Sequence, residues 1–338
     1  MTLRLSKISV FLTLLVFMLS LDTSTAETIN GYTFYLPLVY QQPYPCGVEV
    51  WRGFGYTNQL ADLNCRYTRY NPGTENSPNL YRTWLTNNKN WSSLDFAETD
   101  IAKIRAARTE PVIVFFGNHD GTCTRLSVLR YQEFTNFVRS AVGRWNLRYI
   151  EIWNEPDYLD GHPNLYGCWG IEYTSQLVQL LRMVTATVWS THPNVSVGTS
   201  FTYESHSPGM MQAVAAEFQN EARFILGFHH YGIYGMLSDP TIEQQVDIIR
   251  TFWPGRLWLT ETNIRKWSSD GMCHDPDNGL RQAQAELIMD AQEIRELDTM
   301  IAFGLSTYSS SWQCTALLEN DWSPNPAYQA LNNNWHYP

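Results

Sequence analysis

The stretch RYIEIWNEPD at residues 148–157 decides the fold, because a nearly unbroken apolar run ends abruptly in polar residues. Residues 148–154 are rich in β-branched and aromatic side chains and predict a buried strand. A second stretch, RLWLTETN at residues 256–263, repeats this design, and its carboxylate is Glu261. Glu155 and Glu261 each follow an apolar strand, where burying a carboxylate is costly unless it has a partner or a purpose.

Around these two stretches, short apolar runs alternate with segments of helical periodicity. Strands that alternate with helices of this length indicate parallel βαβ units, and eight strands point to one closed (β/α)8 TIM barrel rather than an open doubly wound sheet. No GxGxxG motif follows the first strand, which disfavours a dinucleotide-binding sheet. The expected strands are residues 47–53, 65–70, 111–117, 148–154, 195–201, 224–231, 256–262 and 301–308. The expected helices are residues 94–108, 126–142, 171–190, 208–220, 241–252 and 279–297, with weaker ones at 56–63 and 326–331. Residues 71–93, polar and containing Pro72 and Pro78, are expected to form one long loop.

Composition excludes several kinds of partner. Of 338 residues, 23 are Lys or Arg and 33 are Asp or Glu, so the net charge is −10. Because phosphate binding needs clustered positive charge, we expect neither a nucleic-acid partner nor an anionic membrane. Aromatic residues make up 14% of the chain. Exposed rings often form flat platforms for ligands, which hints at a sugar or a base.

The first 26 residues resemble a secretory signal peptide. Arg4 and Lys7 form a positive segment, an apolar stretch follows at residues 8–21, and small residues occupy positions 24–26. The apolar stretch is too short to span a membrane comfortably, and no later one approaches about 18 residues. We therefore expect a secreted, extracellular protein whose folded domain is residues 27–338.

Two carboxylates at the ends of different strands of a barrel can face each other, because a barrel gathers the carboxyl ends of its strands at one mouth. Such a pair can flank a glycosidic bond, one protonated and donating to the leaving oxygen, the other ionised and attacking the anomeric carbon. The alternative is that each is a solvated or ion-paired strand end, which is less expected for both together.

These two segments together resemble the retaining glycoside hydrolases of clan A, which include β-xylosidases and endoglucanases. The resemblance implies that Glu155 is the acid/base and Glu261 the nucleophile, and that Asn154 binds the sugar 2-hydroxyl. It also matches His229 and Tyr231 to the clan's His-x-Tyr, in which the Tyr hydrogen-bonds the nucleophile. Alternation along the strand puts these two on one face and turns His230 away.

Other positions follow from the resemblance with alternatives left open. Arg69 fits the arginine that steadies the nucleophile, with Arg66 as competitor, and Trp312 fits the aromatic floor for the reacting sugar. Either Asn118 or His119 could reach a sugar hydroxyl, and Trp267 could line a neighbouring subsite. Glu151 is expected inside the barrel and Asp157 in a loop, neither of them catalytic.

Six cysteines in an exported chain favour disulfides, although six allow fifteen pairings. Bridged Cα atoms must lie within about 7 Å, so the strand layout predicts three bridges between neighbouring elements. They are Cys46–Cys65, Cys123–Cys168 and Cys273–Cys314. No cysteine or histidine cluster has zinc spacing, and we expect neither a metal nor a cofactor.

The sequence thus predicts a secreted, monomeric glycosidase that takes a β-glycan or β-glycoside substrate. Two alternatives share its residues. One is a carbohydrate-binding barrel without catalysis, and the other is a transglycosylase, in which a sugar instead of water intercepts the intermediate.

Overall fold

The computed structural model describes residues 24–29, 32–37, 44–72, 79–116, 125–157, 169, 171–202, 208–233, 240–265, 278–306, 315–319 and 323–333. The chain divides into two compact units, Met1–Gln42 and Pro43–Pro338. In the first, β1 (Ser24–Ile29) pairs antiparallel with β2 (Tyr32–Pro37), so that Ser24 lies opposite Pro37. The predicted signal peptide lies outside the described residues except for its last three positions.

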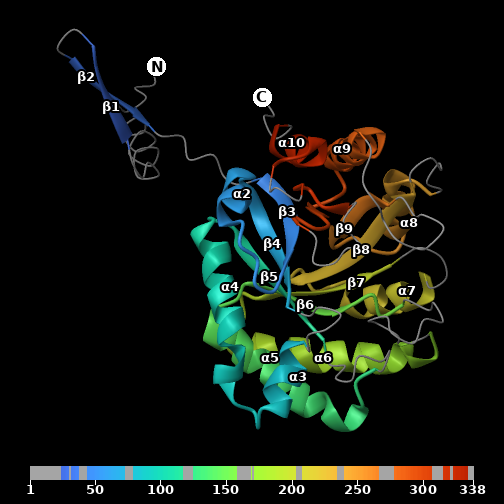
Figure 1. The fold of residues 1–338 in the computed structure, drawn as a ribbon. Helices are drawn as coiled ribbons and strands as arrows, with labels where there is room; N and C mark the ends of the chain where they lie inside the picture. The colour runs from blue at the N-terminus through green and yellow to red at the C-terminus, as the bar shows by residue number, and fades with distance from the viewer. Residues whose placement is uncertain are drawn as a thin grey trace, which may run out of the picture. The chain divides into compact units, whose positions relative to one another are not determined.

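The second unit is a closed barrel of parallel strands with helices around it (Figure 1). In the part of the chain that the structure describes, the order around the barrel is β10-β3-β4-β5-β6-β7-β8-β9, which confirms the predicted (β/α)8 fold. The strands are β3 (Tyr44–Trp51), β4 (Cys65–Asn71), β5 (Glu110–Phe115), β6 (Tyr149–Asn154), β7 (Ser196–Phe201), β8 (Phe224–Ile233), β9 (Arg256–Arg265) and β10 (Thr299–Ala302).

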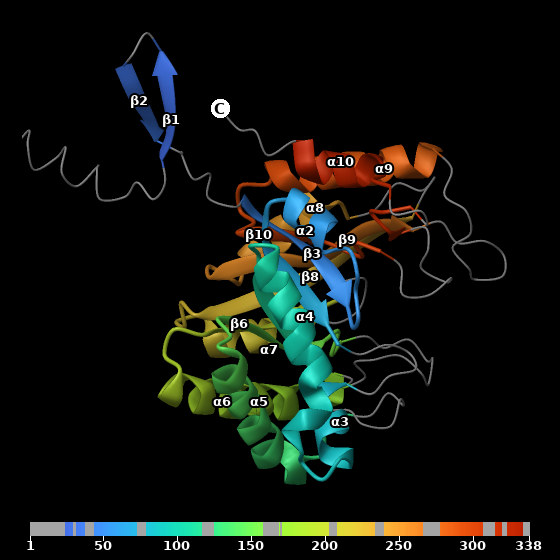
Figure 2. The same cartoon turned by 60° about the vertical axis from the view of Figure 1, so that its left-hand side comes forward.

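Helices connect and cover these strands, and Figure 2 shows α5 beside α6 and α9 beside α10 on the outside of the barrel. Local sequence signals explain where helices begin. At the start of α8, the Thr241 side chain accepts from the backbone N–H of Gln244, and the Gln244 side chain accepts from that of Thr241. The helices are α2 (Thr57–Asp62), α3 (Leu80–Thr86), α4 (Asp95–Ala106), α5 (Tyr131–Trp145), α6 (Thr174–Thr191), α7 (Pro208–Phe218), α8 (Ile242–Arg250), α9 (Asn278–Glu293) and α10 (Pro326–Asn333), with 3₁₀ turns at Trp91–Leu94, Val128–Arg130 and Ile171–Tyr173. None of the described helices is long and apolar enough to cross a membrane.

The prediction of one long loop at residues 71–93 is wrong, because α3 and a 3₁₀ turn lie within it. Asn79 starts α3 by accepting a hydrogen bond from the backbone N–H of Arg82 at 2.9 Å. Trp84 and Trp91 then pack on Phe137 of α5, with ring centroids 5.0 and 5.4 Å apart. The prolines had suggested an irregular segment, but the aromatic side chains bury enough surface to order the part after them.

Among the described residues, an apolar layer and a charged layer lie inside the barrel. The apolar layer is nearer the N-terminal ends of the strands and consists of Tyr67, Val112, Ile225, Trp258 and Ile301, with Tyr149 against it. Because side chains two residues apart share a face of a strand, the next interior positions after Tyr67 and Tyr149 are Arg69 and Glu151. The barrel interior is therefore apolar around Tyr67 and charged around Arg69, two residues further along β4.

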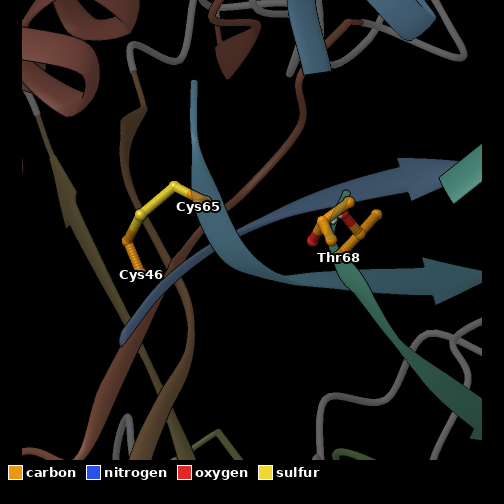
Figure 3. Close-up of a disulfide and its surroundings, with 4 residues drawn as sticks. Cys46, Cys65 and Thr68 are labelled. Atoms are coloured by element: carbon orange, nitrogen blue, oxygen red, sulfur yellow. Dashed lines mark hydrogen bonds between the residues drawn. A yellow bond between two sulfur atoms is a disulfide. The ribbon is translucent and has the colours of Figure 1, made fainter. Parts of the chain in front are cut away.

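A disulfide fixes β3 to β4 below this charged layer. Cys46 and Cys65 are bonded with Cα atoms 4.9 Å apart (Figure 3), as predicted. Beyond it the two strands pair in register, so that Glu49 lies opposite Arg69. The other two predicted bridges, Cys123–Cys168 and Cys273–Cys314, lie outside the described residues.

Candidate active site

The end of β6 departs from regular strand geometry just where the predicted acid/base lies. Between Glu151 and Asn154 the register with β7 shifts, with one residue more on β6 than on its partner. Trp153 and Glu155 have φ angles of 68° and 51°, in the left-handed region that non-glycine residues rarely adopt. The extra residue brings Asn154 to the same side as Glu151, which regular alternation would not do.

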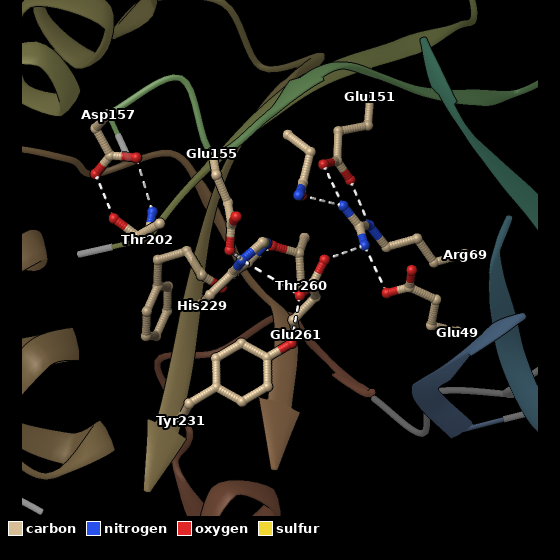
Figure 4. A network of polar contacts seen from close by, with 12 residues as sticks. Glu49, Arg69, Glu151, Glu155, Asp157, Thr202, His229, Tyr231, Thr260 and Glu261 are labelled. Carbon is tan, nitrogen blue, oxygen red and sulfur yellow. Dashed lines mark hydrogen bonds and ion pairs between the residues drawn. The ribbon is translucent and has the colours of Figure 1, made fainter. Parts of the chain in front are cut away.

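Two contacts to β7 and the segment after it hold this strained end in place. The backbone N–H of Glu155 donates to the carbonyl of Ser200 at 2.8 Å. Asp157, buried in the following turn, accepts from the backbone N–H of Thr202 at 2.9 Å and from its hydroxyl at 3.0 Å (Figure 4). Burial raises the pKa of Asp157 to about 6, although the Thr202 hydrogen bonds oppose the shift. Asp157 thus follows the strand as expected and holds the segment that carries Glu155 against Thr202.

Arg69 lies fully buried at the centre of the charged layer. Its Nε and Nη2 donate to the two oxygens of Glu151 at 2.8 and 2.7 Å, and Nη2 also donates to Oδ1 of Asn154 at 2.5 Å. Its Nη1 donates to Oε2 of Glu49 at 2.6 Å and to Oε1 of Glu261 at 2.5 Å. All five N–H groups of the guanidinium are therefore used. Arg66, the competing candidate, is exposed and lies over the ring of Tyr67.

Glu261 reaches this layer through a second irregularity. Phe228 of β8 pairs with Leu259, but His229 pairs with Glu261, so β9 carries one extra residue at Thr260. Without that residue, Glu261 would not share the interior face with Trp258, three positions earlier. Its other oxygen, Oε2, accepts a hydrogen bond from the hydroxyl of Tyr231.

The two neighbouring histidines of β8 point in opposite directions, as alternation predicted. Nδ1 of His229 lies 2.8 Å from Oε1 of Glu155 and 3.5 Å from Oε2 of Glu261 (Figure 4). Nδ1 of His230 instead contacts Oε1 of Gln245 in α8 at 3.0 Å. Only His229 therefore belongs to the site.

The charges around Glu261 and His229 set the protonation states of these two residues. Burial alone would raise the pKa of Glu261, but His229, Arg69 and the Tyr231 hydrogen bond outweigh it and hold that pKa below its usual range. Burial would lower the pKa of His229, yet Glu261 and Glu155 outweigh burial and raise it to about 8. Glu261 is thus kept as an anion, and the imidazole beside it is kept protonated near neutral pH.

The spacing of the carboxylates is short. One oxygen of Glu155, one oxygen of Glu261 and a ring nitrogen of His229 all lie within 4.8 Å of one another. The side chain of Glu155 is 22% exposed and that of Glu261 is 6% exposed, so the former is the more open to an incoming molecule. Arg69 and protonated His229 supply positive charge beside Glu261.

The structure therefore brings together Asn154, Glu155, His229, Tyr231 and Glu261 around Arg69. The remaining predicted positions, Asn118, His119, Trp267 and Trp312, lie outside the described residues. Glu49 is a member of the charged layer that the sequence analysis missed. A lone glutamate between Val48 and Val50 on a buried strand carries the same signal of a costly buried carboxylate that had singled out Glu155 and Glu261.

Comparisons with known proteins identify the architecture. No protein-family model and no curated protein matches the chain. Among solved structures, it is similar to the glycoside hydrolase family 30 subfamily 8 xylanase Xyn30A from Clostridium acetobutylicum, with a TM-score of 0.58, 14% identity, and coverage of 91% of this chain and 72% of that one. A family 10 endo-β-1,4-xylanase from Gloeophyllum trabeum matches with a TM-score of 0.59, 14% identity, and coverage of 86% and 96%.

A GH128 endo-β-1,3-glucanase from Amycolatopsis mediterranei, solved with laminarihexaose, is similar over 85% of this chain and 98% of that one, with a TM-score of 0.52 and 17% identity. At such identities the likeness establishes the fold. The chain folds as the (β/α)8 barrel that these glycoside hydrolases share.

Proposed function

We propose that residues 27–338 form a retaining β-glycoside hydrolase, with Glu261 as nucleophile and Glu155 as acid/base. The observation that carries the proposal is the spacing, since oxygens of the two carboxylates lie within 4.8 Å of each other. Retaining glycosidases place their carboxyl groups about 5–5.5 Å apart, whereas inverting ones leave about 6.5–9.5 Å for a water molecule. The similar solved structures, two xylanases and an endo-β-1,3-glucanase, agree with it.

In the first step, the glycosidic oxygen takes the proton of Glu155 while Oε1 or Oε2 of Glu261 attacks the anomeric carbon. The bond from that carbon to the leaving oxygen breaks, and a bond from the carbon to Glu261 forms. Arg69 and Tyr231 favour this assignment of roles, because they donate to Glu261 alone of the two carboxylates and keep it ionised.

In the second step, Glu155, now ionised, takes a proton from water, and the water oxygen displaces Glu261 from the anomeric carbon. Two displacements restore the original anomeric configuration. Formation of the glycosyl ester removes the negative charge of Glu261, which makes it easier for Glu155 to ionise and to act as a base. Transglycosylation differs only in that a sugar hydroxyl replaces the water.

For substrate contacts, we assign the sugar 2-hydroxyl to Asn154, which adjoins Glu155 and is held by Arg69. We keep Trp312 as the floor for the reacting sugar, His119 for a hydroxyl and Trp267 for a neighbouring subsite. The substrate is a β-linked glycan or glycoside, and the protein acts as a monomer without a cofactor.

A substrate panel tests the proposal. The panel comprises β-1,4-xylan, β-1,3-glucan, β-1,4-glucan and aryl β-glycosides, with product analysis, and we expect turnover of at least one member. Glu261→Gln should lower kcat by at least about 10³-fold, because no nucleophile remains. The matched control is Glu243→Gln, an exposed carboxylate of α8 that should keep full activity. Binding of a glycan without any turnover would instead favour a carbohydrate-binding barrel.

The acid/base has its own signature. Glu155→Ala should cost far less with aryl glycosides that carry good leaving groups than with natural glycosides, because only the latter need a proton. Equal losses on both substrate classes would contradict the role of Glu155.

We further propose that the protein is secreted and loses residues 1–26. The leader-like composition of that segment and the disulfide Cys46–Cys65 support this, since disulfides persist in oxidising compartments. Expression of the full chain in a secreting host, followed by N-terminal sequencing of the medium, should give Glu27 as the first residue. Retention in the membrane fraction with an intact leader would contradict it.

A further inference from the structure

Glu49, like Glu151, is an acidic residue of the charged layer that the proposed reaction does not use. It lies on β3 opposite Arg69, and its side chain is 0% exposed. Oε2 accepts from Nη1 of Arg69 at 2.6 Å, whereas Oε1 is buried and has no hydrogen-bond partner among the described residues. Figure 4 shows Glu49 and Glu261 on the same end of the guanidinium, with Glu151 on the other edge.

The hydrogen bonds of Arg69 show what Glu49 does there. Glu151 binds two N–H groups side by side and so fixes the plane of the guanidinium. The two N–H groups of Nη1 remain, one for Glu261 and one for Glu49. Glu49 thus occupies the donor that would otherwise point into the barrel without a partner.

Charge counting decides the state of Glu49. The guanidinium and the protonated His229 already balance two carboxylates, Glu151 and Glu261, so a third anion at Glu49 would leave these five groups with a net charge of −1. Removing an unbalanced anion from water costs several kcal/mol, whereas a buried neutral hydroxyl without a partner costs about 1–3 kcal/mol. A neutral acid is the cheaper state.

We propose that Glu49 is a positioning residue that acts through Arg69. As a neutral carboxylic acid, it accepts one hydrogen bond from Nη1 of Arg69. The positive charge of the guanidinium then stabilises only the anions of Glu151 and of the nucleophile Glu261. The proposal rests on the function proposed above for Glu261. Glu49 does not touch the substrate, because its side chain is fully buried.

The groups that face Glu49 agree with this state. They are Arg69 from β4, Glu151 from β6, Glu261 from β9 and Tyr56 from the segment before α2. Burial, reinforced by Glu261 and Glu151, outweighs Arg69 and raises the pKa of Glu49 to about 8. The carboxyl therefore keeps its proton through the acidic and neutral range.

The acidic limb of the kcat/KM profile separates a neutral Glu49 from an ionised one. That limb follows the deprotonation of the nucleophile. If Glu49 is neutral, Glu49→Gln replaces one uncharged acceptor with another, and the midpoint of the limb should move by less than about 0.3 pH units. An ionised Glu49 would raise the pKa of Glu261, so its replacement would move the limb down by half a unit or more, which would overturn the proposal.

A second comparison tests positioning. Glu49→Met removes the acceptor, and kcat should fall at least about tenfold with KM little changed, because only the alignment of Arg69 and Glu261 is disturbed. Glu49→Gln should recover most of that loss. If Glu49→Met keeps the parent kcat, Glu49 does not position the nucleophile.

Unfolding measurements keep the proposal testable without activity. A group whose pKa is raised from 4.5 unfolded to about 8 folded stabilises the fold fully below 4.5 and loses that contribution as the pH rises through 8. The urea midpoint of Glu49→Gln, compared with that of the parent, should therefore rise steadily from pH 4.5 to 8. A difference that stays constant would show that Glu49 is ionised. An inactive parent with the rising difference would refute the glycosidase and leave the neutral Glu49 standing.

Discussion

Replacing Arg69 with Met should destabilise the barrel in a way that depends on pH. The change removes the positive charge that faces the buried carboxylates Glu151 and Glu261. Breaking a buried ion pair costs about 3–5 kcal/mol, because it leaves a charge without compensation. Near pH 5 the carboxyls left without Arg69 can take up protons, so we expect a loss of about 3 kcal/mol there. At pH 8 these carboxyls must stay ionised in the interior or take up protons from a solution that holds few, so we expect a loss of about 5 kcal/mol.

The sign follows from linkage. In the parent, the pKa of Glu261 is lowered, so its contribution is present above the unfolded pKa and is lost as the pH falls. In Arg69→Met the pKa is raised instead, so stability is lost as the pH rises. Urea unfolding, followed by tryptophan fluorescence at pH 5, 6.5 and 8, measures the stability of the parent and that of Arg69→Met. The control is Arg66→Met, an exposed arginine on the same strand, which should cost less than about 1 kcal/mol at every pH. A loss for Arg69→Met that equals the control, or that does not grow with pH, would refute the reasoning.

Three further changes probe the scaffold. Burial raises the pKa of Asp157 from 3.8 to about 6, whereas an amide has no charge to bury. The unfolding free energy of Asp157→Asn, measured with urea, should therefore rise by about 3 kcal/mol relative to that of the parent between pH 4 and 7. A difference that does not change with pH would contradict this. Replacing Cys46 and Cys65 with Ser opens a bridge across 19 residues and should lower the unfolding free energy by about 3 kcal/mol. Gly227→Ala would place a Cβ directly against Oγ of Ser200 on β7 and 3.0 Å from Thr260 on β9. We expect a loss of about 1–3 kcal/mol in the unfolding free energy and a lower kcat, because Thr260 precedes Glu261; full activity would mean that Ser200 and β9 can shift without harm.

The fold was predictable because its signal is periodic. Apolar runs separated by amphipathic helices specify a parallel barrel whatever the details of the loops. The error at residues 71–93 arose where the sequence is polar on average. Leu80 and Tyr81 are nevertheless buried, and Asn79 caps the helix that carries them. Burial by a few large side chains is a tertiary effect that composition alone does not reveal.

Most of the described residues that meet around Arg69 were predictable, but their geometry was not. Alternation placed His229 and Tyr231 on one face correctly. It would have turned Asn154 away from Glu151, because one extra residue on β6 changes which side chains point inward. Bulges of this kind depend on pairing with the neighbouring strand, and a pattern of period two within one strand cannot show them. Glu49 is a different case, because it lies within β3, whereas the rule that locates barrel sites points to the ends of strands.

The stereochemistry of hydrolysis tests the central claim most directly. An aryl β-glycoside that the enzyme accepts is followed by proton NMR from the first minute, before the released sugar mutarotates. Two displacements at the anomeric carbon, first by Glu261 and then by water activated by Glu155, predict that the β-anomer appears first and the α-anomer only by later equilibration. First appearance of the α-anomer would mean a single displacement and would contradict the assignment of Glu261 as nucleophile.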